Sequence, residues 1–171
     1  MVSWKEWLAR HPETLALVAP SARDPRGDIY AAYHRSRDLG VTGRLRASGR
    51  PDPKSRIVGF RLDGRAYAVT LRAITETPIV LTRVSGGGVV VAASRDGVGA
   101  RVFRAGIHRL TLAARGRQLT DVVTASTWDA ISGTAIAGPL RGTVLEEIPA
   151  HPAYWFAWRA FYPNSEWITP P

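Results

Sequence analysis

The sequence predicts a mainly β fold: an antiparallel barrel-like or strongly bent sheet of about eight short strands, with short aromatic helices near both termini. Three observations predict it. Segments of strand length follow one another from residue 56 onward, separated by turn residues. Two of the turns carry Asp-Gly, at 63–64 and 96–97, which is a strong hairpin signal. No long helical pattern alternates with the strands, as a βαβ fold would require.

The chain has 171 residues, 45% of them hydrophobic, which is enough for one domain with its own core. We therefore predict a single domain over residues 1–171. It divides into a terminal helix–strand element at 1–18, a loop-rich segment at 19–55 and a β core at 56–150. The terminal element resembles residues 152–168 near the other end of the chain.

Residues 1–18 are predicted to form a helix followed by a strand. The S-x-x-E pattern at 3–6 is a capping box and favours a short helix over residues 4–10. Pro12 ends that helix. The apolar run TLALV at 14–18 then predicts a buried strand.

The remaining elements follow from turn residues and apolar runs. Residues 19–55 are rich in Pro, Gly, Arg and Asp, so we expect an ordered loop with one helical turn in DIYAAYHRS. The glycine run at 86–88 predicts a hairpin turn. Pro152 favours the first turn of a helix that runs to about Tyr162. The predicted strands are RIVGFRL, RAYAVTL, PIVLTRV, VVVAAS, ARVFRA, HRLTLAA, QLTDVVT and TVLEEI.

One short pattern occurs twice, as SWKEWLARHP and as YWFAWRAFYP. Its W-x-x-W spacing places two rings on one helical face, which is the usual arrangement for packing. We predict that the first helix packs on its own domain and buries Trp4 and Trp7, because an uncovered aromatic face is unfavourable. Docking on a neighbouring molecule is the alternative, with all four tryptophans as candidate interaction residues. The matching residues, at a constant offset of 151, are Trp4, Trp7 and Pro12 against Trp155, Trp158 and Pro163.

The basic charge is unevenly distributed. The formal net charge is +9, from 23 Lys and Arg against 14 Asp and Glu. Residues 1–72 hold 14 basic and 7 acidic side chains, and residues 83–117 hold 7 basic side chains and only Asp96. Such a surface can attract nucleic acid or another polyanion weakly and in a salt-dependent way. A solvated arginine-rich surface is the alternative, since no nucleic-acid-binding motif accompanies the charge.

Composition also disfavours several classes of site. The absence of cysteine excludes disulfides, thiolate metal sites and cysteine nucleophiles. The four histidines do not pair at the spacing of a local metal motif, so we expect no metal and no cofactor. The chain lacks an apolar run of about 18 residues, so no membrane insertion is expected. Charged residues interrupt the first twenty positions, so we expect no signal peptide and a cytoplasmic location unless a leader was removed.

The stretch GTAIAGPLRGTVLEEIPA at 133–150, with the preceding Trp128, resembles a bacterial and archaeal domain-of-unknown-function family, number 3179. The segments SWKEWLARHPETLAL, DPRGDIYAAYHRS and RIVGFRLDGRAYAV resemble further parts of that family, so nearly the whole chain is covered. The resemblance implies the fold but no activity. It also implies that such domains occur in tandem, with the W-x-x-W helix closing one unit.

The chain departs from the family pattern at three polar motifs. Thr75-Glu76 stands where the family commonly has His-Glu. TRVSGGGVVV at 82–91 replaces a turn with two cysteines, and HRLTL at 108–112 replaces a polar segment. The positions that could host metal, redox or nucleophilic chemistry are therefore the ones that differ.

Two groups of residues are candidates for ligand binding. Glu76 with Arg72 is a candidate acid/base pair, although one carboxylate is weak support. The Gly/Pro-rich loop after Trp128 is a candidate pocket wall, and its alternative is an ordered loop that packs Ile136 and Leu140 into the core. The candidate ligand-binding residues are Glu76, Arg72, Trp128, Gly133, Thr134 and Gly138.

Together these observations predict a non-catalytic binding or assembly module, a degenerate relative of an uncharacterised family, whose partner is another protein or a second copy. A small-molecule or metal-binding protein with hydrolytic or redox activity is the first alternative. A weak nucleic-acid or polyanion binder, acting through the arginine-rich face, is the second.

Overall fold

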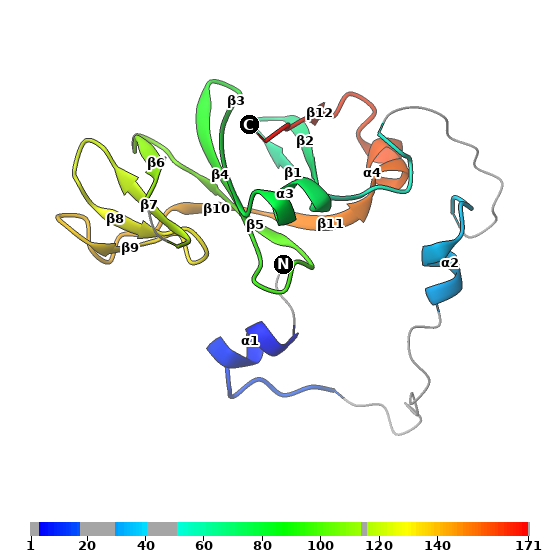
Figure 1. The fold of residues 1–171 in the computed structure, drawn as a ribbon, viewed down its shortest axis with the longest axis horizontal. Coiled ribbons are helices and arrows are strands. Elements are labelled where there is room, and N and C mark those ends of the chain that lie inside the picture. Colours follow the sequence, from blue (N-terminus) through cyan, green and yellow to red (C-terminus); the bar gives the residue numbers. More distant parts are fainter. Residues whose placement is uncertain (1–3, 18–29, 41–50, 114–115, 171) are drawn as a thin grey trace.

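The fold is mainly β, as predicted. The computed structural model describes residues 4–17, 30–40, 51–113 and 116–170. Within these residues, twelve strands form three four-stranded sheets, accompanied by four short helices (Figure 1). These described strands do not close into a barrel, so neither the barrel nor the number of eight is confirmed. Several strands have only two to four residues, too short for an apolar pattern to reveal.

Sheet 1 contains the hairpin predicted around Asp63-Gly64. The two turn residues have φ angles of 49° and 79°, the left-handed conformation of a tight hairpin turn. All pairs in this sheet are antiparallel except the one between β12 and β2. In spatial order the strands are β11 (Ala150–Tyr154), β1 (Arg56–Leu62), β2 (Arg65–Thr70) and β12 (Glu166–Trp167).

Sheet 2 lies between two cores. Val89 and Val91 face a cluster shared with sheet 1, and Val90 and Ala92 face a cluster shared with sheet 3. A strand buried on both faces reads as a continuous apolar run, which explains the segment VVVAA. In spatial order the strands are β10 (Glu146–Ile148), β5 (Ala100–Arg104), β4 (Gly87–Ala93) and β3 (Ile79–Val84).

Sheet 3 covers the far side of sheet 2. Its core is built around Trp128 and Leu119, which pack against Phe103 of sheet 2. Its outer strands are β6 and β9, and Thr134 of β9 also forms an isolated antiparallel bridge with Val144. In spatial order the strands are β6 (Leu110–Leu112), β7 (Gln118–Asp121), β8 (Thr127–Asp129) and β9 (Thr134–Ala137).

The helices are α1 (Trp4–Arg10), α2 (Ala31–Arg35), α3 (Leu71–Glu76) and α4 (Trp155–Phe161). Figure 1 shows α1 and α2 outside the three sheets. The bounds of α1 and the turn at α2 match the sequence prediction, although Ser3 of the capping box lies outside the described residues. No described helix is long and apolar enough to cross a membrane.

Two local predictions are wrong, and one short helix was not predicted. The segment 14–17 forms no strand and is not buried. Pro152 lies inside β11, opposite Val58, instead of opening a helix. Because β11 ends sheet 1, its Pro needs no hydrogen-bonding partner on the outer side. Helix α3 was not predicted, because six residues are too few for a helical periodicity; the Thr70 hydroxyl accepts a hydrogen bond from the Ala73 N–H and caps it.

Candidate functional site

The C-terminal copy of the tryptophan pattern is packed inside its own chain. Trp155 and Trp158 are only 7% and 3% exposed and lie on the outer face of sheet 1. The residues of that face that contact the rings include two small ones, Ala66 and Ala68, beside Ile57. A Cβ placed on Gly59 would lie 2.6 Å from the Trp158 ring, so glycine is needed there. Gly59, Ala66 and Ala68 thus form a site on sheet 1, called the seat below, that accommodates these two rings.

The N-terminal copy has no such seat. Trp4 and Trp7 are 53% and 43% exposed, and Leu15 and Leu17 are almost completely exposed. The predicted packing of α1 on its own domain, with both rings buried, is therefore wrong for the described chain. The reason is that α4 occupies the outer face of sheet 1, and β12 occupies the edge of β2.

Locally, however, the two copies are alike. Both helices have seven residues, and their bounds coincide at the offset of 151. The His11 N–H donates to the Trp7 carbonyl at 2.9 Å, as the Tyr162 N–H does to the Trp158 carbonyl. The Trp7 ring also lies tilted against the His11 ring at 4.2 Å between centroids, as the Trp158 ring does against Tyr162 at 4.4 Å. The two copies are therefore alike in structure as well as in sequence.

Trp128 and the glycine loop after it lie together in sheet 3. The Trp128 side chain is completely buried. Gly133 has a positive φ, and a Cβ on it would lie 2.6 Å from the Phe103 ring. Gly138 also has a positive φ, and a Cβ there would lie 2.7 Å from the backbone of Ser126. Thr134 begins β9 beside them. In this geometry the four residues pack the loop against the core.

The sequence predicted that two apolar side chains of this loop, Ile136 and Leu140, enter the core. Leu140 packs against the cluster around Trp128, as expected. Ile136 is 41% exposed, so the expectation that it packs into the core is wrong. It lies on β9, an edge strand of sheet 3. Alternating strand residues point to opposite faces, so burial of Ala135 turns its neighbour outward.

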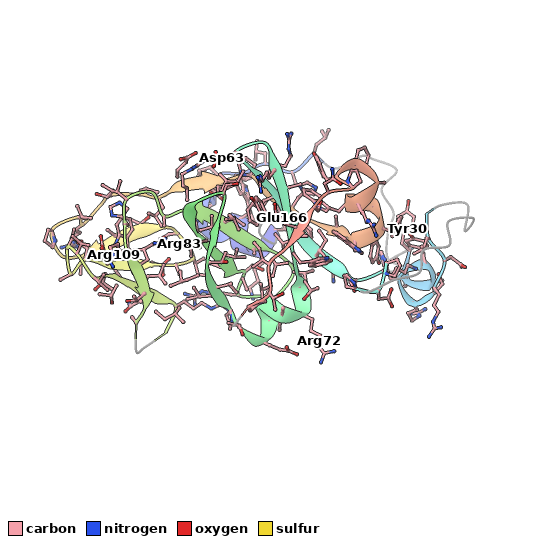
Figure 2. All side chains as sticks on the ribbon, turned by 90° about the horizontal axis from the view of Figure 1, so that it is seen from above. Tyr30, Asp63, Arg72, Arg83, Arg109 and Glu166 are labelled. Atoms are coloured by element: carbon pink, nitrogen blue, oxygen red, sulfur yellow. The ribbon has the colours of Figure 1, made fainter. Side chains whose placement is uncertain are left out.

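Arg72 and Glu76 lie elsewhere. They form an ion pair of 3.0 Å, one turn apart on α3, with side chains 87% and 64% exposed. Figure 2 shows Arg72 pointing outward from α3, away from Arg109 and sheet 3. Neither residue lines the groove described next. An exposed pair of this spacing is a common feature of helix surfaces.

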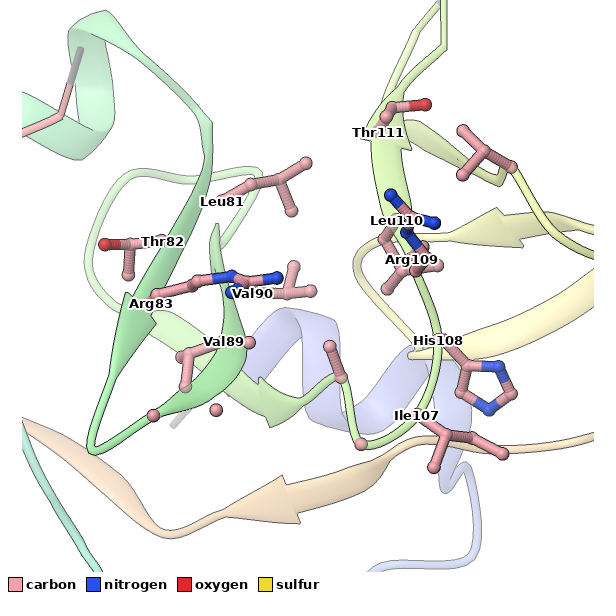
Figure 3. Close-up of a pocket in the computed structure, with 16 residues that line it drawn as sticks. Leu81, Thr82, Arg83, Val89, Val90, Ile107, His108, Arg109, Leu110 and Thr111 are labelled. Carbon is pink, nitrogen blue, oxygen red and sulfur yellow. The ribbon is translucent and has the colours of Figure 1, made fainter.

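A groove of about 540 Å³ lies between the β3–β4 hairpin and the segment that leads into β6 (Figure 3). No sequence prediction identified it. A signal was nevertheless present: residues 82–91 and 108–112, where the chain departs from the family pattern, contribute to its two walls. The lining residues are Leu81, Thr82, Arg83, Gly86, Gly87, Gly88, Val89, Val90, Ala105, Gly106, Ile107, His108, Arg109, Leu110, Thr111 and Val122.

A buried carboxylate supports one wall of the groove. His108 Nδ1 lies 3.1 Å from Oδ2 of Asp121, a fully buried residue. Burial acts to raise the pKa of Asp121, but hydrogen bonds from the Val123 N–H, from His108 and from the Thr124 hydroxyl outweigh it and hold the pKa below its usual value. Asp121 is therefore ionised at neutral pH, and it orients the His108 ring.

The histidines do not assemble a metal centre in the described part of the chain, where no group of three or more potential ligands occurs. His11 lies tilted against Trp7, and His151 lies edge-on to Trp158 at 5.3 Å. His34 Nδ1 lies 2.5 Å from the Tyr154 hydroxyl. The described histidines are thus spread over separate elements.

Comparison with known proteins gives one match. Neither the curated proteins nor the solved structures contain a match to this chain. The pattern of a family described as "Protein of unknown function (DUF3179)" matches residues 1–165, which confirms the resemblance seen in the sequence. The chain therefore belongs to the DUF3179 family of proteins of unknown function.

Proposed function

We propose that the protein is a non-catalytic assembly module that pairs with a second copy of itself through residues 4–17, named here the N-terminal element. The observation that carries this proposal is the exposure of the element. Trp4, Trp7, Leu15 and Leu17 are each exposed to solvent within this one short element. Large apolar side chains that gather in an exposed segment support an interaction site.

The C-terminal copy indicates what such a surface requires. Its rings are covered by a sheet, and Ile168, the counterpart of Leu17, is only 6% exposed. The seat in sheet 1 is filled in every copy of the chain by its own α4. A second copy therefore offers no vacant seat of this type in its described residues, and the N-terminal element needs another cover.

The N-terminal element of the second copy is that cover. It carries the same exposed apolar residues, so each copy can bury the surface of the other in a two-fold symmetric contact. Residues 4–17 contain two basic residues, Lys5 and Arg10, and two acidic residues, Glu6 and Glu13. This balance reduces the repulsion that the net charge of +9 would otherwise cause between copies.

Light scattering over a dilution series tests the proposal. We expect a concentration-dependent dimer in the full chain, and a monomer in the double variant Trp4→Ser, Trp7→Ser. The matched control is Phe161→Ser, which removes an 80% exposed aromatic ring from α4 and should leave the dimer intact.

Two results would contradict the proposal. A full chain that stays monomeric at the highest concentration would exclude self-assembly. An open-ended series of larger assemblies would exclude the two-fold contact, because a symmetric contact closes at the dimer.

A further inference from the structure

We infer that the groove between β3 and β6 binds an organic anion, a small molecule with an apolar body and one anionic headgroup. The site is separate from the N-terminal element, so the inference does not depend on self-assembly. Three features of the groove support it: its unpaired cations, the apolar side chains among its lining residues, and its width.

The cations are Arg83, on β3, and Arg109, in the segment before β6. Figure 3 shows both side chains at the gap between the two walls. In the described part of the chain neither has an ion-pair partner, and no Asp or Glu lines the groove. By contrast, the nearby Arg101 is paired with Glu147, and Arg104 with Asp63.

This difference matters because a guanidinium group binds carboxylate and phosphate oxygens through paired, charge-assisted hydrogen bonds. Because no carboxylate is among the lining residues, the two arginine side chains keep those donors for a ligand. The nearby carboxylate of Asp121 is buried and accepts hydrogen bonds from His108 and from the Arg109 backbone. The two guanidinium groups also repel each other, and an anion between them removes that repulsion.

Several apolar side chains line the groove together with the arginines. Leu81 shares one face of β3 with Arg83, two residues on, and lies across the groove from Leu110 (Figure 3). Val90 forms part of the same lining. At the rim, Ile107 and Val122 are 93% and 55% exposed, more than such side chains usually are. An apolar ligand body that covered them would gain burial as well as charge pairing.

The width of the groove favours a small molecule over an extended peptide. Both β3 and β6 are edge strands, so a peptide strand could in principle pair with them. A strand that paired with both edges needs a separation of about 9.6 Å, twice the usual strand spacing. Cα atoms of β3 and β6 approach within 8 Å, which leaves too little room. The volume of about 540 Å³ lies in the range of small-molecule sites.

Calorimetric titration with three probes separates the contributions. Decanoate has both an apolar body and an anionic headgroup, 1-decanol has the body alone, and inorganic phosphate has the charge alone. We expect saturable 1:1 binding of decanoate, and binding at least about tenfold weaker for each of the other two probes.

Variants assign that binding to the groove. Arg83→Gln and Arg109→Gln should each weaken decanoate binding by about tenfold, because each removes a charge-assisted pair. The matched control is Arg159→Gln, an exposed arginine on α4 that loses the same charge outside the groove. Thermal unfolding of each variant establishes that it is folded.

Three results would overturn the inference. Unchanged decanoate affinity in both groove variants would place binding elsewhere. Equal weakening in Arg159→Gln would show that only the net charge matters. Equal affinity for 1-decanol would show that the arginines contribute nothing. Titration of the Trp4→Ser, Trp7→Ser variant keeps this test independent of assembly, because that variant retains the whole groove.

Discussion

The two tryptophan elements have the same local structure and opposite surroundings. Helices α1 and α4 share their length, their bounds at the offset of 151 and the aromatic contact one turn beyond the second tryptophan. Yet Trp158 is 3% exposed, and its counterpart Trp7 is 43% exposed. A W-x-x-W pattern therefore determines a helix with an aromatic face, and the environment alone determines whether that face is buried.

The difference lies in what sheet 1 provides. Gly59 leaves room for the Trp158 ring, and Ala66 and Ala68 keep the face flat. The edge of β2 accepts β12 as a parallel strand, and Ile168 then enters the main core. The N-terminal element finds none of these within the described chain. Four predicted changes in stability test this difference between the two elements, from the largest expected effect to the smallest.

Trp128→Ala should lower the free energy of unfolding by about 3–5 kcal/mol, because the ring is fully buried and the core around it cannot collapse completely. Chemical denaturation measures this change. This loss of unfolding free energy is the reference value for the changes predicted in the two tryptophan elements. A variant with native stability would show that Trp128 does not hold the fold, and loss of a binding activity would then make it a functional residue.

Trp158→Ala and Trp7→Ala form the matched pair. Removal of the buried Trp158 ring should lower the free energy of unfolding by about 3 kcal/mol, at the lower end of the usual range because Gly59, which faces the ring, has no side chain that would lose contacts. Removal of the exposed Trp7 ring should change stability by less than about 0.5 kcal/mol in dilute protein. Similar losses of unfolding free energy in the two variants would mean that the Trp7 ring is buried as well, contrary to its exposure in the structure.

Gly59→Ala tests the seat itself. The added Cβ would lie 2.6 Å from the Trp158 ring, so the ring must move, and stability should fall by about 1–3 kcal/mol. Gly87→Ala is the control, because its Cβ would meet only the Val84 carbonyl at an ordinary 3.8 Å. Thermal unfolding compares the two. An equal effect in both would remove the special role of Gly59.

Glu166→Gln should have the smallest effect among the changes to the buried C-terminal element. Its carboxylate lies 3.1 Å from the Arg65 guanidinium and links β12 to β2, but the side chains are 52% and 66% exposed. Such a pair contributes less than about 1 kcal/mol and is screened by salt. Leu15 stands at this place in the N-terminal element, which has no equivalent pair. Unfolding at low and high salt measures the contribution; a salt-independent loss would point to a cause other than the ion pair.

Much of the β core could be predicted because its signals are local. The hairpin at Asp63-Gly64 follows from two residues that tolerate positive φ angles. The bounds of α1 follow from a capping pattern and a nearby proline. The burial of Trp128 and the need for Gly133 follow from a motif whose residues all lie in one short stretch. In each case the residues that carry the signal are close in sequence, although Trp128 and Gly133 pack against the distant Phe103.

The groove could not be predicted, because its walls come from segments about 25 residues apart whose approach depends on how sheets 2 and 3 pack. The sequence showed only that both segments depart from the family pattern. Their arginines became a candidate site once the structure showed that neighbouring arginines are paired and these two are not.

By itself, the sequence determined the mainly β class, the repeat of the tryptophan helix and the family, because turn chemistry, helix capping and motif order act over a few residues. Only the tertiary structure decided that β4 is buried on both faces, that Pro152 belongs to an edge strand, and that one tryptophan helix is seated while the other is exposed. These outcomes depend on which strand edges and sheet faces remain vacant after residues far apart in sequence have paired. Two segments with the same local pattern compete for such places, and sheet 1 seats only one of them.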